Sequence, residues 1–134
     1  MLQHDIVMDD IRKTARIIEK IFGIKSKGMV NEFRQEFDKT LQNEYAVELE
    51  QLLALNQEDF EVVIKSEKYS AEKLITLSQM LYVFAEPFEQ DEETRQLLKK
   101  VMAILDVLEE KHHIQSFDNI TRRNAIYRYF DIKP

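Results

Sequence analysis

The stretch with the clearest capacity for chemistry is LEEKHHIQSF, residues 108–117, in which two adjacent glutamates precede two adjacent histidines. Glu109 and Glu110 stand three residues before His112 and His113, respectively. On a helix, this Glu-x-x-His spacing puts a carboxylate and an imidazole on one face, as in the ligand sets of di-iron helical proteins. The stretch is therefore the first place to consider for a metal site.

The rest of the sequence does not complete such a site. A di-iron bundle needs the motif on two helices and a glutamate from each of two more, whereas both copies here share one predicted helix. The only other histidine is His4, and the zinc-protease pattern His-Glu-x-x-His is absent. Histidines in a last helical turn also suit the negative end of the helix dipole. We therefore predict a helix end that holds no metal and no cofactor. The alternative metal ligands are Glu109, Glu110, His112 and His113.

A second stretch, TRRNAIYRYF at 121–130, mixes arginines with aromatic residues. Such a mixture could stack on nucleic-acid bases, but Arg and Tyr are also common anchors at protein interfaces. The formal net charge of −6 argues against general nucleic-acid binding, which depends on neutralising phosphates. The partner-binding candidates are Arg122, Arg123, Arg128 and Tyr129.

Other chemistry has little support in the sequence. The absence of cysteine excludes thiol catalysis and zinc-thiolate sites. KSKG at 25–28 lacks the Gly-x-x-x-x-Gly-Lys-Ser/Thr pattern of a phosphate-binding loop. The serines and threonines after residue 60 have no histidine at motif spacing. We predict that the protein is not an enzyme.

The composition indicates long helices. Only two glycines and two prolines occur in 134 residues, too few for the many turns of a β-rich fold. The length fits one domain over 1–134, and 44% hydrophobic residues provide for a core. The first residues lack the features of a signal peptide, and no run of about 18 apolar residues would cross a membrane. We therefore expect a cytoplasmic protein.

Apolar residues recur at steps of three and four, which is the spacing of one helical face. Gly23 is expected to end the first helix, and Ser70 to begin the fourth. A bend near Asn43 is the alternative to one long second helix. Helices are predicted over about 5–22, 29–55, 56–66, 71–86, 92–113 and 118–130.

The last two helices are predicted to form an antiparallel hairpin. The broad apolar face of 92–113 implies contact with two neighbours. In the helix over 118–130, Ile120, Tyr127 and Phe130 are expected to face inward and Tyr129 outward. The hairpin would bring the arginines at 122–123 close to the acidic surface of the preceding helix.

Two stretches carry a resemblance to known proteins. MLQHDIVMDDIRKTARIIEKIFG and ILDVLEEKHHIQSFDNITRRNAIYRYF resemble a family of short bacterial all-helical proteins of unknown function. The shared features are the M-x-Q-x-D opening and an L-x-E-K turn that leads to S-F before a charged helix. The second stretch also resembles one hairpin of a tetratricopeptide array, without the Trp and Gly of that repeat. The resemblance implies an all-helical fold and supplies no catalytic residues.

The sequence as a whole predicts an all-α protein with about six helices in antiparallel hairpins, arranged as a bundle or as a short tetratricopeptide-like array. We expect a non-enzymatic binding or scaffold module that acts through protein–protein interaction. A protein, a peptide or a second copy of the chain is the expected partner. The alternatives are a metal- or small-ligand-binding helical protein and a nucleic-acid accessory protein that uses the basic last helix. A groove between hairpins would favour peptide binding, whereas a closed bundle would not.

Overall fold

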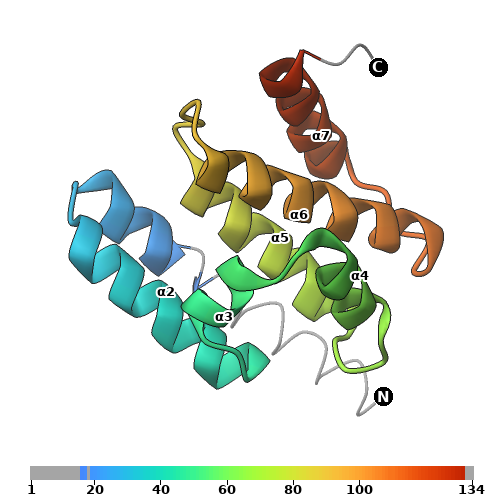
Figure 1. Ribbon diagram of the computed structural model, residues 1–134, viewed down its shortest axis with the longest axis horizontal. Helices are drawn as coiled ribbons and strands as arrows, with labels where there is room; N and C mark the ends of the chain where they lie inside the picture. Colours follow the sequence, from blue (N-terminus) through green and yellow to red (C-terminus); the bar gives the residue numbers. More distant parts are fainter. Residues whose placement is uncertain (1–15, 18, 132–134) are drawn as a thin grey trace. The chain divides into compact units, whose positions relative to one another are not determined.

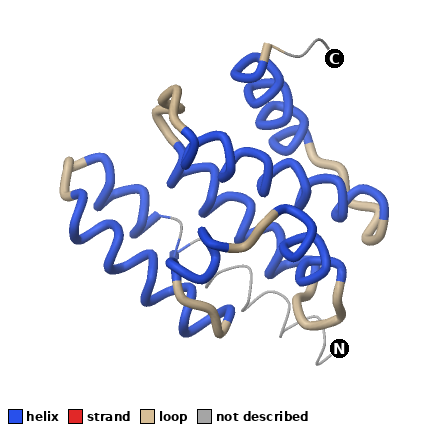
Figure 2. The backbone as a smooth tube through the Cα atoms, viewed as in Figure 1, coloured by secondary structure: helices blue, strands red, loops and turns tan. Residues whose placement is uncertain are grey.

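The structure is a computed structural model that describes residues 16, 17 and 19–131 (Figure 1). All regular structure within these residues is helical (Figure 2), which confirms the predicted all-α class with about six helices. No helix in the described ranges is both long enough and apolar enough to cross a membrane. The chain divides into two compact units, Met1–Ala54 and Leu55–Pro134. The single domain expected from the length stays a prediction.

In the first unit, residues 16–17 and 19–26 are helical, so most of the helix expected over 5–22 lies outside the described residues. The expected end at Gly23 is wrong, because the helix continues past it and the chain turns at residues 27–28. Gly28 has a φ of 74° and donates its N–H to the carbonyl of Lys25 at 3.0 Å. A left-handed backbone favours glycine, and so the second glycine ends the helix.

The single long helix predicted over 29–55 is also wrong. The chain forms two helices there, α2 (Val30–Tyr45) and α3 (Leu49–Ala54). Ala46 adopts a left-handed conformation with a φ of 55° and donates its N–H back into the last turn of α2. The bend near Asn43, which the sequence left as the alternative, is the closer description.

The start of α3 depends on a side chain from α2. One carboxylate oxygen of Asp38 accepts the N–H of Leu49 at 2.8 Å. The side-chain oxygen of Gln51 accepts the N–H of Glu48 at 3.0 Å. These two bonds satisfy donors that a helix start leaves free, and the first of them joins residues 11 positions apart. The spacing of apolar residues does not encode such a contact, and so it did not predict the break between α2 and α3.

The described part of the second unit contains α4 (Gln57–Lys65), α5 (Ala71–Ala85), α6 (Glu92–Glu110) and α7 (Phe117–Phe130). Each begins after a polar residue whose side chain accepts the N–H of the third residue beyond it. This contact satisfies one of the free donors at a helix start. The four capping residues are Asn56, Ser70, Asp91 and Ser116, of which Ser70 was predicted.

The central helix of the second unit is α6. It packs along α5 and also contacts α4 and α7, so its broad apolar face meets three neighbours where two were expected (Figure 1). Burial of apolar side chains from all of these helices removes them from water and stabilises the unit. The buried side chains of α6 include Leu97, Leu98, Val101, Ile104, Leu105 and Leu108.

The inward face of α7 differs from the prediction. Ile120 is 38% exposed, whereas Ile126 is fully buried. Six residues separate these two side chains in the sequence, which places them about 120° apart around a helix. Both are apolar, so the spacing of apolar residues alone does not specify which of the two faces the rest of the unit.

Candidate functional site

The glutamate–histidine stretch does not form a helical Glu-x-x-His motif. The prediction that the helix continues to residue 113 is wrong, since α6 ends at Glu110 and Lys111 is its cap. His113 has a φ of 56°, so the backbone leaves the helical path there. The shared helical face that would bring Glu110 and His113 together is therefore lost.

The four alternative metal ligands lie in different surroundings. Glu109 forms an ion pair with Arg123, with 3.2 Å between Oε1 and Nη2. Glu110 and His113 are exposed, whereas His112 is half-buried and its Nε2 has no hydrogen-bond partner. Within residues 16–17 and 19–131, no group of three or more His, Asp or Glu side chains is placed to hold a metal ion. The chain's metal and cofactor content stays a prediction.

The lysine in this stretch joins the ends of two helices. Lys111 Nζ donates to the carbonyl of Lys65, the last residue of α4, at 2.7 Å. It also lies 3.1 Å from a carboxylate oxygen of Glu67. At the other end of α4, Gln57 Nε2 donates to the carbonyl of Lys99 on α6 at 3.1 Å. These contacts show that α4 and α6 run in the same direction, and they join the two helices at both ends of α4.

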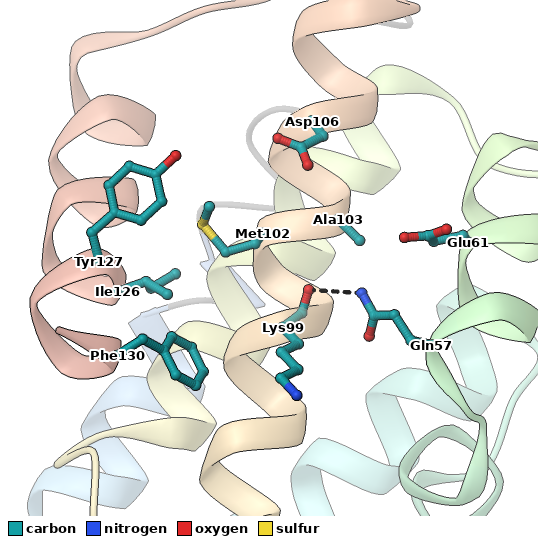
Figure 3. A pocket seen from close by; sticks show the side chains of 9 residues that line it. All are labelled: Gln57, Glu61, Lys99, Met102, Ala103, Asp106, Ile126, Tyr127 and Phe130. Carbon is teal, nitrogen blue, oxygen red and sulfur yellow. Dashed lines mark hydrogen bonds between the residues drawn. The ribbon is translucent and has the colours of Figure 1, made fainter. Parts of the chain in front are cut away.

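A groove of about 310 Å³ lies between α4, α6 and α7 (Figure 3). This volume is at the lower end of the range for pockets that bind small molecules, about 300–1,000 Å³. Two helices supply its apolar surface, and one small residue, Ala103, leaves room at its base. The apolar lining residues are Met102 and Ala103 of α6 with Ile126 and Phe130 of α7.

The rim of the groove is polar. Gln57 and Glu61 come from α4, one helical turn apart, while Lys99 and Asp106 come from α6. Tyr127 of α7 completes the rim (Figure 3). An apolar base with a few polar groups around it is typical of sites that bind other molecules rather than of a packed core.

The groove follows from a second face of α6. Lys99, Met102, Ala103 and Asp106 are spaced three, one and three residues apart, so they share one side of the helix. That side is offset by one residue from the buried stripe that begins at Leu98, which corresponds to about 100° of rotation. Sequence reasoning missed Met102 and Ala103 because no linear motif marks a groove. The signal available in the sequence was a helical face with two apolar residues between two charged ones, Lys99 and Asp106.

Arg123 holds one wall of the groove in place. Its Nη1 lies 2.9 Å from Asp106 Oδ1, and its side chain is only 14% exposed. Burial lowers the pKa of Arg123, but hydrogen bonds to Tyr127 and Asp106, with the charges of Asp106 and Glu109, outweigh burial and raise the pKa above its usual value. The predicted approach of this arginine to the acidic surface of the preceding helix is confirmed.

The other partner-binding candidates lie outside the groove. Arg122 is placed over the ring of Tyr82, with 5.9 Å between Cζ and the ring centroid, and Arg128 is exposed. The expectation that Tyr129 points outward is wrong, because its hydroxyl donates to the carbonyl of Glu89 at 2.8 Å. Its ring is half-buried and meets the ring of Phe88 edge-on, with 6.0 Å between centroids. The role of these residues in partner binding stays a prediction.

Comparison of the chain with protein-family models, with curated proteins and with solved structures finds no match.

Proposed function

We propose that the protein is a non-enzymatic helical binding module that takes an amphipathic segment of a partner protein in the groove between α4, α6 and α7. The observation that carries this proposal is the apolar base formed by Met102, Ala103, Ile126 and Phe130. A groove of this kind accepts apolar side chains from one face of a helix, which is a common mode of peptide recognition.

The hairpin formed by α6 and α7 supplies most of this surface. It is the part of the chain that resembles one hairpin of a tetratricopeptide array, and arrays of helical hairpins use concave surfaces for binding. The polar rim favours a peptide over a lipid or a purely apolar ligand, because polar groups around an apolar centre are typical of protein interfaces. Hydrogen bonds join α4 to α6 at both ends of α4, and a wall that is already positioned lowers the ordering cost of binding.

The two alternative functions have less support. A small ligand would bind in the same groove, and it would therefore compete with the peptide for binding. A nucleic-acid role would use the basic last helix, but Arg123 is already paired with Asp106 and Glu109. This pairing removes one of the three arginines of α7 from phosphate binding.

The proposal is tested by selection from a phage-displayed library of random 16-residue helical peptides. We expect enriched peptides to bind the unaltered protein and to lose at least tenfold in affinity with Met102→Glu, which puts a charge into the apolar base. Met29→Glu is the matched control, because Met29 is exposed in the other unit. Circular dichroism and thermal melting establish that both variants are folded.

Failure to enrich any peptide that is sensitive to Met102→Glu would reject the proposal. Light scattering on the same samples tests the remaining possibility that a second copy fills the groove. If the protein is a dimer and Met102→Glu converts it to a monomer, the occupant of the groove is a second copy of the chain and not a peptide of another protein.

A further inference from the structure

We infer that the groove selects a partner helix with a basic residue at one end of its contact face and an acidic residue at the other. This inference rests on the proposed function and adds the specificity of the same site. It follows from the charges at the rim of the groove, which have opposite signs at its two ends (Figure 3).

One end of the groove carries an excess of negative charge. Asp106 comes from α6, and Glu61 comes from the facing side of α4. Since α4 and α6 run in the same direction from the bond between Gln57 and Lys99, Glu61 lies one turn along the groove toward Asp106. Arg123 pairs with both Asp106 and Glu109, so one cation serves these two acids.

Glu61 is the anion available for a ligand. It forms no ion pair within the described residues, whereas Asp106 and Glu109 share the guanidinium of Arg123. The net charge of Glu61, Asp106, Glu109 and Arg123 together is negative. A lysine or arginine from the partner would offset this charge.

The other end of the groove carries Lys99. Its side chain is exposed and points away from Asp106 and Glu61 (Figure 3). Lys99 forms no ion pair within the described residues, and Glu92, whose carboxylate its charge stabilises, already has hydrogen bonds from Arg95 and Gln96. Lys99 is therefore available to an acidic side chain of a ligand.

The distance between the two ends sets the pattern of the ligand. Lys99 and Asp106 are seven residues apart on one helix, which corresponds to about 10 Å along the axis. A partner helix that lies along α6 would match this distance with an acidic and a basic residue at positions i and i+7. Apolar residues at i+3 and i+4 would then lie over Met102 and Ala103, since these positions share one helical face.

In the test, peptides are selected from the phage-displayed library of random 16-residue helical peptides, separately for binding to the unaltered protein and to charge variants. On the unaltered protein we expect enrichment of acid–base pairs at i and i+7 with apolar residues between them. On Lys99→Glu, both ends of the groove are acidic, so we expect pairs of basic residues instead. Lys27→Glu makes the same charge change in the exposed turn of the other unit and is expected to retain the original pattern.

Binding of one selected acid–base peptide gives a second measurement. We expect Glu61→Gln to weaken the affinity for this peptide about two- to fivefold at low salt, as for a partly exposed ion pair. In roughly 0.5 M salt we expect the difference in affinity between the variant and the unaltered protein to shrink, because salt screens the ion pair and not the apolar contacts. Glu58→Gln, an exposed acid on the same helix, is the control and is expected to leave affinity unchanged.

The outcomes separate the two levels of the proposal. If selected peptides depend on Met102 but show the same charge pattern on the unaltered protein and on Lys99→Glu, the charge inference is rejected and the binding function stands. If no peptide depends on Met102, both fail. A change to paired basic residues on Lys99→Glu alone supports the inference.

Discussion

The guanidinium of Arg123 on α7 lies 2.9 Å from the carboxylate of Asp106 on α6, and this contact joins the last helix to the centre of its unit. The same guanidinium reaches Glu109, one turn nearer the end of α6, at 3.2 Å. Because Asp106 also belongs to the rim of the groove, the contact that fixes α7 also shapes the candidate site.

Loss of this contact is expected to destabilise the protein. Arg123→Ala removes a guanidinium that is only 14% exposed and leaves two carboxylates without their cation. We expect a loss of about 1–2 kcal/mol in the free energy of unfolding, between the values for exposed and for buried pairs. Urea denaturation measures it, and the exposed Arg128→Ala is the control, with an expected change within about 0.5 kcal/mol. Equal effects of the two variants would show that the pairing contributes nothing.

A leucine in the middle of α6 tests the core of the second unit. Leu105 is 1% exposed, and Leu105→Ala is expected to cost about 2–5 kcal/mol in unfolding free energy, through lost burial and the cavity that remains. Thermal and urea melting measure this cost. Glu110→Ala, at the exposed end of the same helix, is the control. A loss below half a kcal/mol, roughly the value for a surface change, would contradict the described packing.

Tyr129 connects the end of α7 to the loop between α5 and α6. Tyr129→Phe keeps the ring contact with Phe88 but removes the hydroxyl that donates to Glu89. We expect it to cost about 0.5–1.5 kcal/mol, the usual value of one hydrogen bond. Tyr129→Ala also removes the ring, and so we expect a larger loss. If both variants have the melting temperature of the unaltered protein, Tyr129 does not stabilise the fold, and a role in partner binding becomes the better explanation.

Lys100 is a lysine with 1% of its surface exposed, and its Nζ lies 5.7 Å from the centroid of the Phe60 ring. Burial lowers the pKa of Lys100 from its usual 10.5. Replacement by an apolar side chain of similar length, Lys100→Met, is expected to increase the free energy of unfolding by roughly 1 kcal/mol, because removal of a poorly solvated charge outweighs the lost contact with the ring.

The pH dependence gives this prediction a second measurement. The folded chain binds the proton of Lys100 more weakly than the unfolded chain, so between the two pKa values the unfolded state holds more protons. The stability contributed by this group therefore rises with pH through that window, up to about 10.5. We expect the advantage of Lys100→Met over the unaltered protein to shrink as the pH approaches 10.5. An advantage that is constant or grows with pH would contradict the lowered pKa.

The histidines test the alternative metal site. We expect His112→Ala and His113→Ala, singly or together, to leave the metal content at background, because α6 ends before either histidine. Elemental analysis of protein purified without a histidine tag measures this content. Stoichiometric iron or zinc in the unaltered protein that is lost in the double variant would contradict this prediction and would indicate that Glu109 and Glu110 are ligands.

The sequence by itself determined the helical class and much of the second unit. Steps of three and four between apolar residues specify helices, and the polar cap at Ser70 marks where one of them starts, because both signals act within one turn of chain. The same local signals predicted the broad apolar face of the helix over 92–113, on which Leu105 and Leu108 are buried.

Only the tertiary structure decided the break between α2 and α3, the rotation of α7 and the groove. The break depends on Asp38, which accepts the N–H of a residue 11 positions away, and the choice of Ile126 over Ile120 depends on how α7 packs on α6. The groove needs side chains of three helices, brought together by contacts such as Arg123 with Asp106, whose partners are 17 residues apart. A local pattern cannot specify these features, since the energies that fix them come from groups that meet only after the helices have packed.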